Sequence, residues 1–64
     1  MTLVAGVDIG NATTEIVIVD LPSARPVAWD RARTIGVKGS PEAARAAGRL
    51  LTRIQARHDL RVEL

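Results

Sequence analysis

The 64-residue sequence contains no cysteine, phenylalanine or tyrosine, and Trp29 is its one aromatic residue. Without cysteine, the chain can form neither a disulfide framework nor a thiolate site for zinc or an iron–sulfur cluster. It also lacks an apolar run near the ~18 residues that a membrane span needs, and a basic segment typical of a signal peptide. We therefore expect a soluble, cytoplasmic protein with one small aliphatic core, too small for two domains or for a complete enzyme with a deep cleft.

Basic residues are absent from the first 24 positions, whereas all nine lie in residues 25–64 beside four of the seven acidic residues. An arginine-rich half is typical of some proteins that bind nucleic acid or an acidic partner. Arginines repeated along a helix more often form a solvated face, so we expect no nucleic-acid partner. A non-catalytic interaction module that uses this face remains an alternative. The face is called the arginine stripe below and consists of Arg45, Arg49, Arg53 and Arg57.

Hydrophobic periodicity predicts three consecutive strands. Residues 3–9 alternate, and residues 13–21 are almost continuously apolar from 16 to 19, as in a strand that is covered on both faces. Residues 27–35 alternate as a more exposed and curved strand. Residues 10–12 form a connection short enough to force an antiparallel hairpin. The face shared along the first strand consists of Leu3, Ala5, Val7 and Ile9.

A helix is predicted from Ser40 to about His58, because serine is a good N-cap and is followed by Pro41 and Glu42 in the first turn. Gly48 is unfavourable inside a helix, and we expect close packing against the sheet to offset its cost. The predicted buried stripe consists of Ala43, Ala47, Leu50, Leu51 and Ile54.

Residues 59–64 alternate again, with Leu60, Val62 and Leu64 on one face. This pattern predicts a final strand that the sequence cuts short. The expected order is therefore β-β-β-α-β, with some apolar surface that packs against structure outside these residues or against another copy of the chain.

The hairpin loop carries the residues best suited to chemistry. A tight turn of small residues can point several backbone N–H groups at one spot and form an anion site, to which Thr13 and Thr14 would add hydroxyl donors. Asp8 would repel a phosphate there unless a divalent cation lay between them, and Mg²⁺ is commonly held by a few carboxylates, waters and phosphates. These features predict a loop for the phosphates of a magnesium nucleotide. The alternative is an ordinary hairpin whose polar residues only serve the turn.

Residues 5–19, Ala-Gly-Val-Asp-Ile-Gly-Asn-Ala-Thr-Thr-Glu-Ile-Val-Ile-Val, resemble the first phosphate motif of the actin, hexokinase and heat-shock-70 ATPase superfamily. Residues 6–11, 13–15 and 34–40, the last leading into an Ala-rich helix, resemble the N-terminus of the large subunit of diol dehydratase and glycerol dehydratase reactivases. The resemblance covers nearly the whole chain. It implies a single, incomplete domain over residues 1–64, the opening β-β-β-α-β portion of an actin-like (ribonuclease H-like) α/β ATPase subdomain.

The resemblance also implies a set of site residues. The phosphates of ATP or ADP would contact backbone N–H groups of the loop, with Asp8 near Mg²⁺ and Gly10 allowing close approach. Ala12 departs from the serine expected there, which removes a hydroxyl donor and leaves the backbone donor. The complete set of expected nucleotide-binding residues is Gly10, Asn11, Ala12, Thr13 and Thr14.

Reactivases are chaperone-like ATPases that release damaged cobalamin from an inactivated dehydratase. The resemblance thus implies an ATP-hydrolysing full-length protein, whose partners are the reactivase small subunit and diol or glycerol dehydratase. We expect the 64 residues alone to be inactive, because they contain no second phosphate loop, adenine pocket or water-activating carboxylate. The alternative within the superfamily is the start of a sugar or small-molecule kinase, or of an activator of another radical dehydratase.

Overall fold

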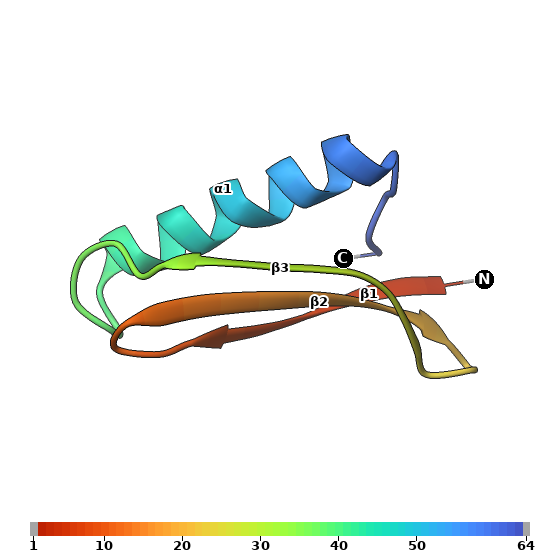
Figure 1. The fold of residues 1–64 in the computed structure, drawn as a ribbon, viewed down its shortest axis with the longest axis horizontal. Helices are drawn as coiled ribbons and strands as arrows, with labels where there is room; N and C mark the ends of the chain where they lie inside the picture. Colours follow the sequence, from red (N-terminus) through yellow and green to blue (C-terminus); the bar gives the residue numbers. More distant parts are fainter. Residues whose placement is uncertain (1, 64) are drawn as a thin grey trace.

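The computed structural model describes residues 2–63, in which three antiparallel strands form one sheet and a helix covers one of its faces (Figure 1). The strands lie in the order β1-β2-β3, so each pairs with its neighbour in the sequence. This confirms the α/β class and the order of the first four predicted elements. The elements are β1 (Thr2–Ile9), β2 (Thr13–Leu21), β3 (Arg25–Arg33) and α1 (Pro41–His58).

Alternation along the strands gives the sheet two different faces. The face under α1 carries most of the buried core, and Ile16, Ile18 and Ile54 have the largest fully buried side chains. The opposite face, called the open face below, carries Gly6, Val17 and Trp29 in one cross-strand row. The core cluster consists of Leu3, Ile16, Ile18, Ala28, Leu50, Ile54 and Val62.

One expectation about burial is corrected by this arrangement, and the cover on β1 is uneven. Within residues 2–63 no element covers the open face, so the apolar run of β2 does not reflect cover on both sides. On β1, Val7 shares the covered side with Leu3 yet remains 50% exposed, because α1 lies closer to β3 than to β1.

Strand β3 lies two residues earlier than predicted. Its first residues are Arg25 and Pro26, and Pro26 is tolerated because β3 is an edge strand with one unpaired side. The pairing shifts between Ile18 and Val19, which marks a bulge in the strand expected to curve. Beyond Arg33 the chain leaves the sheet, since the backbone N–H of Thr34 donates to the loop between β1 and β2.

Helix α1 begins and ends with defined caps. The Ser40 side chain accepts a hydrogen bond from the Ala43 N–H at 3.1 Å, as its N-cap role predicts. Asp59 ends the helix in the left-handed conformation, with a φ of 54°. The predicted stripe faces the sheet, with Leu51 packed against the edge of the core. No helix within residues 2–63 has both the length and the apolar character that crossing a bilayer requires.

Gly48 does not pack against the sheet, contrary to the sequence-based expectation. It is exposed, and a Cβ added to it would have no heavy atom within 4 Å. Its position on α1 therefore carries the conformational cost of glycine without a packing gain.

We expect Gly48→Ala to raise the free energy of unfolding by about 1 kcal/mol, because alanine reduces the backbone entropy that folding must overcome. Urea denaturation followed by far-UV circular dichroism measures the change. Ala44→Gly, at another exposed helix position, is the matched control and should lower stability by a similar amount. A Gly48→Ala variant no more stable than the parent would contradict this account.

Residues 60–63 do not form the predicted final strand, and Leu64 lies outside the described residues. The segment is nevertheless held in place: the Val62 N–H donates to Oε1 of Gln55, and the Glu63 N–H donates to the Leu3 carbonyl oxygen at 2.8 Å. Leu60 and Val62 both pack on the core, as their alternation predicts. The chain after α1 thus reaches the free edge of β1 with one backbone hydrogen bond (Figure 1).

Candidate functional site

The loop between β1 and β2 is closed by its own backbone. The Gly10 N–H donates to the Thr13 carbonyl oxygen at 2.9 Å. A Cβ on residue 10 would lie 3.0 Å from that same oxygen, a tight contact that would push the Thr13 carbonyl back by a few tenths of an ångström. Glycine at this position therefore preserves the tight turn that the sequence predicts.

Thr34 ties the loop to the end of β3. Its backbone N–H donates to the Ala12 carbonyl oxygen at 2.9 Å, and its hydroxyl donates to the Gly10 carbonyl oxygen at 2.8 Å. The Thr14 hydroxyl lies 3.0 Å from the Thr34 hydroxyl. Because the single Thr34 hydroxyl hydrogen is already given to Gly10, the Thr14 hydroxyl is the donor between the two threonines. Thr34 thus holds two loop carbonyl groups at once.

This arrangement occupies two of the three loop carbonyl groups, and the Asn11 carbonyl oxygen accepts no hydrogen bond from residues 2–63. The carbonyl groups of Gly10 and Ala12 are occupied, whereas the N–H groups of Asn11 and Ala12 donate to no atom of residues 2–63. Both residues are exposed, so a ligand from solvent can reach them. Successive free N–H groups in a turn are the usual backbone device for binding an anion.

The strand register divides the other predicted site residues between the two faces. Asp8 pairs with Glu15 on the open face, and Thr13 lies on that face too, opposite Arg33. Thr14 lies on the side under α1 and is buried. The structure therefore brings Asp8 and Thr13 to one side of the sheet and uses the Thr14 hydroxyl to hold Thr34.

Arg31 of β3 lies opposite Glu15 on the open face, so one cation already stands in the same cross-strand row as two carboxylates. Asp8 and Glu15 lie opposite each other on neighbouring strands. They line a shallow hollow of about 490 Å³ on the open face. Within residues 2–63, no three His, Asp or Glu side chains group as a protein-bound metal ion would require. Two carboxylates fit a Mg²⁺ ion that keeps most of its waters and takes its remaining ligands from phosphate. The hollow is also lined by Gly6, Val7, Ile16, Val17 and Trp29.

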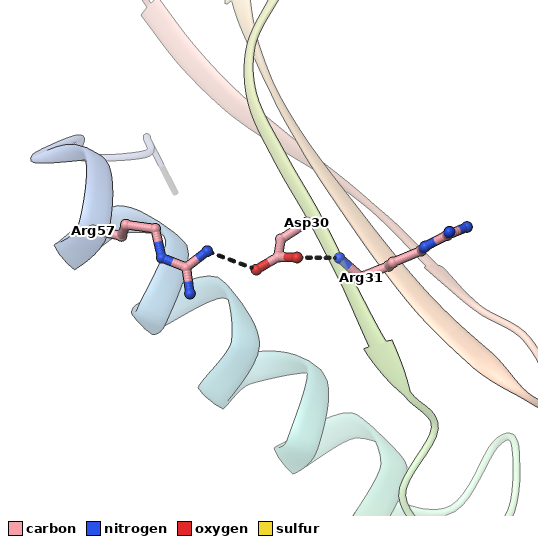
Figure 2. Close-up of polar contacts among 3 residues, drawn as sticks. All are labelled: Asp30, Arg31 and Arg57. Carbon is pink, nitrogen blue, oxygen red and sulfur yellow. Dashed lines mark hydrogen bonds and ion pairs between the residues drawn. The ribbon is translucent and has the colours of Figure 1, made fainter.

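One member of the arginine stripe is engaged with the sheet (Figure 2). The Arg57 Nη1 lies 3.2 Å from Oδ2 of Asp30, and the other carboxylate oxygen, Oδ1, accepts the Arg31 backbone N–H at 2.7 Å. Figure 2 shows the Arg31 side chain pointing away from the helix. The Arg57 side chain is 57% exposed, so the pair contributes only about 0–1 kcal/mol of stability. The main effect of this pair is that the Arg57 guanidinium is less available than the other arginines of the stripe for binding an anionic partner.

Comparison of the chain with models of protein families, with curated proteins and with solved structures found no match.

Sequence reasoning missed the part that Thr34 plays in the site. Residues 34–40 supported the family resemblance, but Thr34 received no structural role. Its position in the sequence could have indicated this role. Thr34 comes directly after the third strand of a meander, where a hydroxyl side chain can reach the loop between the first two strands. Thr34 and Thr14 form a positioning pair behind the loop, and the loop backbone itself presents the donors.

Proposed function

We propose that the loop of residues 10–12 binds the phosphates of ATP or ADP. The observation that carries this proposal is the pair of free N–H groups on Asn11 and Ala12, in a loop where Thr34 donates to the carbonyl groups of Gly10 and Ala12. Asp8, on the open face, would hold a Mg²⁺ ion through one of its bound waters, and the same ion would be bound to the phosphates. Bound magnesium would neutralise phosphate charge. The loop donors would orient the phosphates.

On this proposal, the chain is the phosphate-binding portion of an ATP-dependent reactivating factor that releases damaged cobalamin from diol or glycerol dehydratase. The Glu63 hydrogen bond to β1 supports a place within a larger actin-like subdomain, since a strand after α1 would extend the sheet at that edge. The reactivase small subunit and the dehydratase would be its partners.

The proposal predicts weak, localised binding of magnesium pyrophosphate and MgADP by the 64-residue chain. Charge-assisted hydrogen bonds of about 1.5–3 kcal/mol each from two N–H groups correspond to a dissociation constant on the order of 1 mM. In ¹H–¹⁵N NMR titrations, we expect the largest shifts at Asn11 and Ala12. Turnover of ATP by this chain alone is not expected.

Two variants that each remove one negative charge distinguish the contribution of Mg²⁺ to phosphate binding from that of the loop N–H groups. Asp8→Asn should reduce the magnesium dependence of the shifts and leave the loop amides responsive to pyrophosphate. Glu63→Gln, at an exposed residue at the other end of β1, is the matched control and should change neither. Shifts that avoid residues 10–13, or that are absent at saturating pyrophosphate, would contradict phosphate binding.

A further inference from the structure

A groove beside α1 concentrates positive charge. It has a volume of about 510 Å³, and Arg33 from β3 lines it together with Arg49 and Arg53 from the arginine stripe. All three arginines are exposed. Its lining, as far as residues 2–63 describe it, includes no acidic side chain. The strand register puts the Arg33 side chain on the open face, so Arg33 borders the groove at the end of β3 and the helix arginines supply its charge. The field of two uncompensated cations beside one concave surface attracts anionic groups.

These arginines differ from Arg57 in their pairing. The carboxylate of Asp30 already engages Arg57, whereas Arg33, Arg49 and Arg53 form no ion pair with any described residue. Their guanidinium groups therefore keep their donors free for planar anions such as carboxylates. Binding such anions would also relieve the repulsion between Arg49 and Arg53, which lie one turn apart on α1.

The rest of the groove is mainly apolar, and this favours a peptide over a nucleic acid. Ile35 is 47% exposed and lies beside Ala32, Ala46 and the edge of Leu50 in the lining. An aliphatic side chain placed there would bury apolar surface. Single-stranded nucleic acids instead gain affinity by stacking bases on aromatic rings, and Trp29 lies on the open face outside this groove.

We propose that this groove binds an acidic segment of a partner protein. Carboxylates of the segment pair with Arg49 and Arg53, and one aliphatic side chain covers Ile35. Thr14 lines both this groove and the back of the hairpin loop, but Asn11 and Ala12, whose N–H groups would bind phosphate, do not line the groove. The proposal therefore does not depend on nucleotide binding.

The test uses a fluorescein-labelled synthetic peptide of alternating Glu and Asp with one central Leu, followed by fluorescence anisotropy. We expect binding that weakens as salt is raised, because the attraction between exposed charges is screened. The variant Arg49→Glu/Arg53→Glu should weaken binding by about tenfold or more, since it replaces two attractions by two repulsions. Arg25→Glu/Arg61→Glu carries the same charge change at exposed residues outside the groove and should stay within about twofold at moderate salt.

Two further measurements decide between occupants. Ile35→Ser, and a peptide with Ser in place of Leu, should each weaken peptide binding about threefold or more through lost apolar contact. Circular dichroism shows whether each variant is folded. If Arg49→Glu/Arg53→Glu does not fold, Arg49→Gln/Arg53→Gln takes its place in the test. Peptide binding that is absent at low salt, or equal in the groove and control variants, would overturn the proposal. Preferential binding of a single-stranded oligonucleotide that Ile35→Ser leaves unchanged would assign the groove to nucleic acid instead.

Discussion

Replacement of Ile18 by alanine is expected to remove a large share of the protein's stability. The Ile18 side chain has no exposed surface and lies in β2, the central strand, under the helix. Removing such a side chain costs about 2–5 kcal/mol, through lost burial and the cavity left behind. A domain of this length is stabilised by roughly 3–10 kcal/mol in total. The loss is therefore comparable with the whole free energy of unfolding.

Urea denaturation monitored by far-UV circular dichroism measures this effect. Ile18→Val should cost about 0.5–1.5 kcal/mol, giving a graded series at one site. Val37→Ala removes a similar group from a loop side chain that is 75% exposed, and should change stability by less than about 0.5 kcal/mol. If Ile18→Ala and Val37→Ala had equal effects, the assignment of the core to this side of β2 would be wrong.

Replacement of Thr34 by valine is expected to destabilise the protein by about 1–3 kcal/mol, although the side chain keeps its size. The buried Thr14 hydroxyl would lose the oxygen to which it donates, and the Gly10 carbonyl would lose a donor. Leaving a buried polar group unpaired costs more than the net gain of an ordinary hydrogen bond. The effect should reach the loop, with altered NMR shifts at Asn11 and Ala12.

A double-mutant cycle with Thr14→Val tests this coupling. The double variant should lose less stability than the sum of the single variants, because it removes both partners instead of stranding one. Thr52→Val is the control, since its exposed hydroxyl donates to a carbonyl group within the same helix. Additive effects of Thr14→Val and Thr34→Val would show that the hydroxyl pair does not hold the loop.

Helices and strands were predictable from the sequence where a single local pattern, such as helix periodicity or a short turn, determines the structure of the whole segment. The cap at Ser40 and the apolar stripe of α1 follow from helix periodicity, and the first hairpin follows from its three-residue connection. The ends of β3 were not predictable in this way, because they depend on a bulge opposite β2 and on Thr34 leaving the ladder. The final strand was not formed for a related reason. Alternation places Leu60 and Val62 on the core, but a strand needs a series of backbone hydrogen bonds, and residues 60–63 make one to β1.

The candidate site was predictable in its position and only partly in its organisation. Small residues between two strands indicate a loop with accessible N–H groups, and this description holds for Asn11 and Ala12. The division of Thr13 and Thr14 between opposite faces depends on which face α1 covers, which is set by tertiary packing. Packing likewise decides that Gly48 faces solvent and that Arg57 meets Asp30. Phosphate binding by this loop stays a prediction.

Trp29 gives the chain a built-in optical probe of one surface. It is the sole indole, it is 63% exposed, and it lies on the open face in the row that contains Gly6 and Val17. Because the core contains no aromatic ring, intrinsic emission is tied to this face and not to the interior. Any molecule that covers the open face, including a second copy of the chain, will therefore change the polarity around the fluorophore, while events at the arginine groove leave it in water.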